Sequence, residues 1–82
     1  MKKFDENRYF TVKRELDGRF PYEFENGAIA GAFAQGREDE LTEGKLRKQL
    51  LFNVEEELIT YTEALAVFPM YMAAIKELKN QF

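Results

Sequence analysis

The sequence contains no cysteine, no histidine, no serine and no tryptophan. Without cysteine the chain forms no disulfide, and without histidine it lacks the commonest metal ligand. Nucleophilic catalysis usually places serine, cysteine or threonine beside histidine, so its usual form is excluded. We therefore expect a non-enzymatic protein with no cofactor and no metal site. The missing cysteine also fits a reducing compartment, which favours the cytoplasm.

Long apolar runs and net positive charge are missing as well. The longest uncharged run, Ala64–Ile75, spans 12 residues, whereas a membrane-spanning helix needs about 20. The first six residues carry two lysines and two acids, so we expect neither a signal peptide nor a membrane partner. The net charge of −3 gives the chain as a whole no basic excess to attract nucleic acid.

What the chain does have is a high apolar content for its size. Its 82 residues are 45% hydrophobic and 15% aromatic, which is too apolar for a disordered chain. A domain this small buries only about 60% of the surface that its unfolded chain exposes. Because disulfides and the commonest metal ligand are missing, we expect additional stability to come from a partner chain or from unusually good packing of these apolar residues.

The first half of the chain reads as a sheet. Asn26-Gly27 favours a type I′ turn, since both central residues of that turn need positive φ. Folding the chain there places Phe24 opposite Ile29 and Phe20 opposite Phe33. Residues 9–16 are rich in aromatic and β-branched side chains and predict a preceding strand, joined by a three-residue loop over 17–19.

Pro21 opposes this interpretation, because proline cannot donate a hydrogen bond to the middle strand of a sheet. The alternative is a helix that begins at Pro21 and runs through Ala34. Gly27 and Gly31 would each weaken such a helix by about 1 kcal/mol. We favour the sheet and keep the helix as the alternative.

The second half of the chain predicts helices. Thr42 is placed to cap a long helix, whose apolar stripe is formed by Leu46, Leu50, Val54, Leu58, Tyr61, Leu65 and Phe68. Pro69 is expected to break this helix, because its ring clashes with the carbonyl four residues earlier. A shorter helix then runs over about 69–81. Whether the two helices form a kinked rod or a hairpin stays open.

These segments together predict one α+β domain over residues 1–82. Residues 1–8 are expected to be frayed, 9–35 to form a three-stranded antiparallel meander, and 41–82 to be helical. The order is β-β-β-α-α, with a proline break between the two helices.

The segment Ala64–Ile75 is apolar on nearly every side, so it must be buried all round or contact another chain. We therefore expect a small cytosolic interaction or regulatory protein, acting through protein–protein contacts as a homodimer and with another protein as a second partner. The predicted contact surface comprises Phe68, Met70, Tyr71, Met72, Ile75 and Phe82.

Two alternatives rest on charge. A nucleic-acid-binding module would use basic residues of the first hairpin and of the start of the long helix, namely Lys13, Arg14, Arg19, Lys45, Arg47 and Lys48. A small inhibitor of the phage or mobile-element type would instead present an acidic helix face to a basic groove on its target. That face comprises Glu55, Glu56, Glu57 and Glu63.

Overall fold

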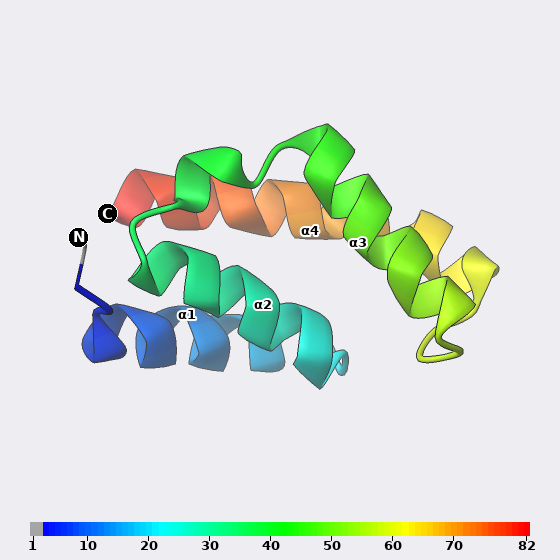
Figure 1. The fold of residues 1–82 in the computed structure, drawn as a ribbon, viewed down its shortest axis with the longest axis horizontal. Coiled ribbons are helices and arrows are strands. Elements are labelled where there is room, and N and C mark those ends of the chain that lie inside the picture. Colours follow the sequence, from blue (N-terminus) through cyan, green and yellow to red (C-terminus); the bar gives the residue numbers. More distant parts are fainter. Residues whose placement is uncertain (1–2) are drawn as a thin grey trace. The chain divides into compact units, whose positions relative to one another are not determined.

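A computed structural model describes residues 3–82 of the chain, and this described part is helical, with no strand. The elements, in order, are α1 (Glu6–Asp17), α2 (Glu23–Ala34), the short 3₁₀ helix η1 (Glu38–Glu40), α3 (Glu43–Glu55) and α4 (Tyr61–Gln81) (Figure 1). The predicted α+β fold with a three-stranded meander over 9–35 is therefore wrong. The chain divides into two compact units, an N-terminal unit, Met1–Leu41, and a C-terminal unit, Thr42–Phe82.

In the N-terminal unit, α1 begins at a side-chain cap rather than in a frayed segment. The Asp5 carboxylate accepts a hydrogen bond from the backbone N–H of Arg8 at 3.1 Å. The backbone N–H of Asp5 donates to the carbonyl of Ala34 at 2.9 Å, which ties the start of α1 to the end of α2. The prediction that residues 1–8 fray is thus wrong from Asp5 onward, while Met1 and Lys2 lie outside the described residues.

The buried side chains of α1 and α2 recur every four residues, as one face of a helix requires. Val12 and Leu16 of α1, and Ile29 and Phe33 of α2, are fully buried. A strand would have placed Phe10 on the same face as Val12, yet the Phe10 side chain is 58% exposed. Aromatic and β-branched content misled the prediction, because β-propensity depends strongly on context.

The predicted hairpin turn, Asn26-Gly27, lies inside α2. The Asn26 side chain is fully buried, and its Nδ2 donates to the carbonyl of Phe20 at 2.9 Å. A Cβ at Gly27 would lie 3.6 Å from the hydroxyl oxygen of Tyr9, which is an ordinary van der Waals contact, so this position has room for alanine. The alternative interpretation, a helix that runs through Ala34, is the one that the structure bears out, although α2 begins at Glu23 rather than at Pro21.

The end of α2 is a Schellman motif, in which the residue after the cap has positive φ. Gly36 adopts φ 72° and its N–H donates to the carbonyl of Phe33 at 3.1 Å. The N–H of Arg37 donates to the carbonyl of Ala32 at 2.8 Å. Glycine fits this position because it pays no steric penalty at positive φ.

In the C-terminal unit, α3 and α4 pack against each other as a helical hairpin (Figure 1). Thr42 caps α3, as the sequence predicts, and accepts from the N–H of Lys45 at 3.4 Å. The helix ends in a second Schellman motif, in which the N–H of Leu58 donates to the carbonyl of Asn53 at 2.9 Å. The positive-φ residue of this motif is Glu57, at φ 62°.

α4 begins with a capping box and runs through the proline that was expected to break it. The Thr60 hydroxyl accepts from the N–H of Glu63, and the Glu63 carboxylate accepts from the N–H of Thr60, each at 3.1 Å. Pro69 lies within α4, so the predicted proline break is wrong. The chain breaks instead at residues 56–60, and the open choice between rod and hairpin is decided for the hairpin.

None of the helices within residues 3–82 combines the length and the apolar character that crossing a bilayer requires.

Candidate functional site

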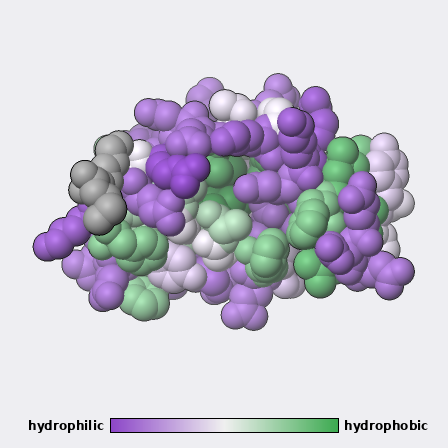
Figure 2. All heavy atoms as spheres, in the orientation of Figure 1, coloured by the Kyte–Doolittle hydropathy of each residue, from purple (hydrophilic) through white to green (hydrophobic). Residues whose placement is uncertain are grey.

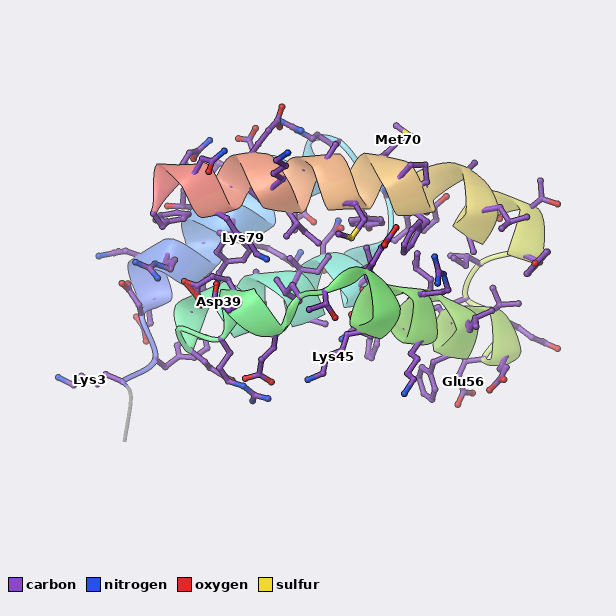
Figure 3. The ribbon with its side chains drawn as sticks, turned by 90° about the horizontal axis from the view of Figure 1, so that it is seen from above. Lys3, Asp39, Lys45, Glu56, Met70 and Lys79 are labelled. Carbon is purple, nitrogen blue, oxygen red and sulfur yellow. The ribbon has the colours of Figure 1, made fainter. Side chains whose placement is uncertain are left out.

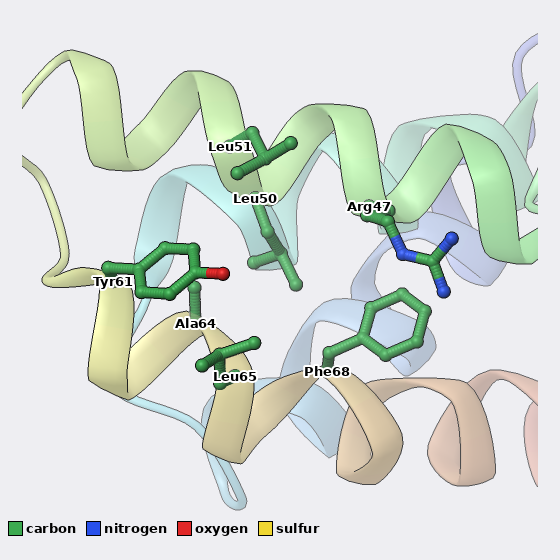
Figure 4. Close-up of a pocket in the computed structure, with 7 residues that line it drawn as sticks. All are labelled: Arg47, Leu50, Leu51, Tyr61, Ala64, Leu65 and Phe68. Atoms are coloured by element: carbon green, nitrogen blue, oxygen red, sulfur yellow. The ribbon is translucent and has the colours of Figure 1, made fainter.

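The C-terminal unit carries an apolar groove between its two helices, with a volume of about 280 Å³. We call it the α3–α4 groove (Figure 4), and it is lined by Arg47, Leu50, Leu51, Tyr61, Ala64, Leu65 and Phe68. The lining residues follow helical spacing on both sides. Positions three and four apart share one helix face, so each helix turns one stripe of side chains toward the groove.

Several of the lining side chains remain exposed. Leu65 is 60% exposed and Tyr61 is 58% exposed, and Leu51 also reaches the surface. Of the ten exposed large hydrophobic residues in the described chain, seven belong to the C-terminal unit: Leu51, Phe52, Leu58, Tyr61, Leu65, Met70 and Phe82. Figure 2 shows one face of the molecule, on which apolar side chains reach the surface among hydrophilic ones. Three of these seven residues, Leu51, Tyr61 and Leu65, line the groove, and exposed apolar side chains concentrated at one place are typical of an interaction site.

One end of the groove carries a positive charge over an aromatic ring. The guanidinium carbon of Arg47 lies 5.1 Å from the ring centroid of Phe68 (Figure 4). The ring face attracts the cation, which contributes about 0.5–1 kcal/mol at an exposed site. The contact ties α3 to α4 and holds the Arg47 side chain at the edge of the groove.

The groove holds no pair of groups suited to nucleophilic catalysis. Its charged and hydroxyl side chains are Arg47 and Tyr61, and the other five lining residues are hydrocarbon. Within residues 3–82, no three side chains of the metal-binding types are grouped so as to hold a metal ion. What the arrangement offers is apolar contact area with a cationic edge, which is the chemistry of a binding surface.

The six residues of the predicted contact surface differ in exposure. Met70 and Phe82 are exposed, while Phe68 is half-buried in the wall of the α3–α4 groove. Tyr71 and Ile75 are 0% and 1% exposed, so neither presents a surface to a partner in this conformation. The half-buried Met72 and the buried Ile75 border a separate shallow hollow on α4 that also includes Ala73, Lys76 and Lys79. A contact surface made of all six residues stays a prediction.

The predicted basic set is divided between the units, with Lys13, Arg14 and Arg19 in the first and Lys45, Arg47 and Lys48 in the second. Lys13 Nζ lies 2.7 Å from the Asp17 carboxylate and 3.9 Å from that of Glu23. The hydrogen bond with Asp17 raises the pKa of Lys13 above its usual value. Arg19 likewise pairs with Glu15 at 3.2 Å. Neighbouring carboxylates therefore offset the positive charges of Lys13 and Arg19, two of the three predicted contact residues in the N-terminal unit.

The predicted acidic set lies where α3 ends and α4 begins. Glu55, Glu56 and Glu57 are exposed, and they form the last residue of α3 and the turn that follows it. Glu63 is engaged in the capping box of α4. The four carboxylates thus gather at the closed end of the hairpin.

A second, polar hollow lies in the N-terminal unit, where the start of α1 meets the end of α2 and η1. It is lined by Lys3, Asp5, Arg8, Ala34, Gln35, Gly36, Glu38 and Asp39. Arg8 and Glu38 form an ion pair across it at 3.4 Å. Bases and acids alternate around this hollow, so it presents no field of one sign to a charged ligand.

Arg47 and Phe68 belong to two separate sets of residues predicted from the sequence, and only the fold brings them together. The missing step is the chain reversal at 56–60, because an unbroken helix places these residues about 30 Å apart. The capping-box pattern from Thr60 to Glu63 was the signal that could have located the reversal. With the reversal in place, the stripes of α3 and α4 face each other and form the groove.

Comparison of the chain with protein-family models, with curated proteins and with solved structures finds no match.

Proposed function

We propose that this chain is a small, non-enzymatic interaction protein that self-associates through the α3–α4 groove and acts through protein–protein contacts in the cytoplasm. The observation that carries the proposal is the exposed apolar side chains along the groove, above all Leu65 and Tyr61. A second copy that covered them would remove apolar area from water, which stabilises by about 25 cal/mol for each Å² buried.

The make-up of the groove supports a protein surface as its occupant. Interface centres are enriched in aromatic residues and arginine and depleted in lysine and acids, and the groove supplies Tyr61, Phe68 and Arg47. Pockets for small ligands usually have volumes of about 300–1,000 Å³, and the groove lies just below that range.

Nucleic-acid binding is less well supported. Two of its six proposed contact residues, Lys13 and Arg19, are paired with carboxylates. Arg47 is placed over the ring of Phe68. Basic side chains bind nucleic acid by neutralising its phosphates, which releases the counterions held there. A carboxylate that already pairs with the basic side chain weakens this interaction. The acidic residues Glu55, Glu56 and Glu57 lie at the end of α3 and in the turn after it, and none of them lines the groove.

The experiment is sedimentation equilibrium of Leu65→Glu beside Ala66→Glu. Both residues are exposed on α4, but only Leu65 lines the groove. We expect Leu65→Glu to shift the mass toward the monomer, because a charge at an apolar contact must be desolvated. Ala66→Glu should keep the wild-type mass. Equal effects of the two variants would contradict the groove as the contact site, and unchanged helical circular dichroism would show that each variant remains folded.

A further inference from the structure

Acidic and basic residues are concentrated at opposite ends of the C-terminal unit. Its closed end, around the α3–α4 turn, carries four acids and no base: Glu55, Glu56, Glu57 and Glu63. Its open end carries five bases, Lys45, Arg47, Lys48, Lys76 and Lys79, and two acids, Glu43 and Glu77. Figure 3 shows Glu56 at the closed end, with Lys45 and Lys79 displaced toward the open end. We call these two groups the acidic end and the basic end.

The α3–α4 groove lies between the two ends. Its exposed apolar residues, Leu51 on α3 and Leu65 on α4, stand between the basic start of α3 and the acidic turn along each helix. Lys45 and Glu56 are eleven positions apart in the sequence, which corresponds to about 16 Å along a helix. This distance exceeds the Debye length of about 8 Å at physiological salt. Each end therefore acts on whatever lies directly against it and little on the other.

We infer that the occupant of the groove is a second copy of this chain in antiparallel orientation, with the acidic end of each copy against the basic end of the other. The inference rests on the self-association proposed above and adds its geometry. A two-fold axis in the interface, perpendicular to α3 and α4, brings groove onto groove and exchanges the ends. A parallel arrangement would instead place four acids against four acids, and like charges facing each other across an interface are strongly unfavourable.

The arrangement also accounts for the division between apolar and charged residues. Interfaces commonly have an apolar centre and a polar rim. Here the centre would be the groove. Beside it on α3 lie Arg47 and Lys48 toward the basic end and Glu55 toward the acidic end. Opposite charges at a rim chiefly set orientation and association rate rather than affinity. The apolar groove therefore supplies the contact energy, and the two ends select which way round the copies meet.

Cross-linking of single-cysteine variants tests the orientation directly, because the wild-type chain has no thiol of its own. Lys48→Cys and Glu55→Cys replace exposed side chains near opposite ends of α3, on the side of the helix next to the groove stripe. The two variants are mixed in equal amounts and treated with a short bismaleimide, and the joined peptides are identified by mass spectrometry. We expect links between position 48 and position 55 in the mixture, and few links between identical positions in either variant alone.

The other outcomes separate the two proposals. Links only between identical positions would overturn the antiparallel geometry and leave self-association standing. A dimeric mass without any link would place the interface elsewhere on the chain and overturn the inference too. A monomeric mass at every concentration, with no link above collision level, would overturn both.

Charge reversal gives an independent check with a built-in rescue. Glu55→Lys, Glu56→Lys and Glu57→Lys together change the net charge of the acidic end from −4 to +2. They should weaken the antiparallel dimer by about tenfold or more in Kd, because two positively charged ends then face each other. Adding Lys45→Glu and Lys48→Glu to the same chain changes the net charge of the basic end from +3 to −1, which restores opposite charges and should restore the dimer. A triple reversal that left Kd unchanged, or a fivefold variant that failed to recover while remaining helical, would contradict the inference.

Discussion

The side chain of Asn26 joins α2 to the end of α1: its Nδ2 lies 3.0 Å from the Oδ1 atom of Asp17 and 2.9 Å from the carbonyl oxygen of Phe20. Asn26 is fully buried. A buried amide is costly unless it is hydrogen-bonded, and here it also satisfies a carbonyl in the loop between the helices. The residue that suggests a β-turn in the sequence therefore fixes the α1–α2 connection.

Replacing Asn26 by alanine should destabilise the chain by about 1–3 kcal/mol, because the Phe20 carbonyl loses a buried donor. Urea unfolding followed by circular dichroism measures this change. The control is Asn80→Ala, an exposed position in α4, where the free energy of unfolding should change by no more than about 0.5 kcal/mol. A loss at Asn26 no larger than at Asn80 would contradict the role of the buried amide.

Replacing two glycines by alanine tests the helical conformation of residues 23–34 and the left-handed residue that follows the helix. A Cβ at Gly31 meets no atom within 4 Å, so Gly31→Ala should stabilise the chain by about 1 kcal/mol through helix propensity. Gly36 adopts φ 72°, and Gly36→Ala should cost about 1–2 kcal/mol because alanine is strained there. Urea unfolding midpoints that moved in the same direction for both variants would contradict this assignment.

Glu57 adopts φ 62° in the Schellman motif after α3, the position that Gly36 occupies in the motif after α2. Replacing Glu57 by glycine should therefore stabilise the chain. Glu57→Gly should be more stable than Glu57→Ala by about 1 kcal/mol. Both variants remove the same charge, so their difference isolates the backbone conformation. Thermal unfolding in parallel samples measures it, and an alanine variant as stable as the glycine variant would argue against the left-handed conformation.

The second half of the fold follows from the sequence better than the first. The Thr42 cap locates the start of α3, and the apolar periodicity of 46–68 locates helical structure on either side of the reversal at 56–60, because both signals are local. The sheet prediction failed because Asn26-Gly27 and the aromatic content have two interpretations, and tertiary packing decides between them. In α1 and α2, the spacing of Val12 and Leu16, and of Ile29 and Phe33, was the better guide.

The position of the chain reversal was hidden for a related reason. Pro69 is a strong breaker in isolation, yet α4 continues through it, and the reversal occurs at Glu57, where no glycine or proline marks it. The α3–α4 groove depends on that reversal, so it could not be assembled from the apolar stripe alone. The sequence identifies the groove residues one by one, but their pairing across the groove follows only once α3 and α4 fold against each other.

Stability at low pH should depend on Asp17. Hydrogen bonds from Lys13 and Asn26 lower the pKa of the Asp17 carboxyl below its usual value. A carboxyl with a lowered pKa in the folded state adds stability above its unfolded pKa of about 3.9, and this contribution is lost as the pH falls through the folded value. Wild type should therefore exceed Asp17→Asn in stability at neutral pH and lose that advantage in acid.

Urea unfolding of both proteins at a series of pH values measures this difference. The account predicts that the gap in unfolding free energy closes as the pH falls below about 4. A gap that stayed constant from neutral pH into acid would mean that the Asp17 charge adds nothing to the N-terminal unit.

Self-association through the C-terminal unit is the central claim, and the molar mass of the wild-type chain tests it most directly. Light scattering on a sizing column, over a range of loading concentrations, distinguishes one copy of the 9.6 kDa chain from two. We predict a mass that rises with concentration and reaches that of two copies. A mass that stays at one copy across the whole range would contradict the claim.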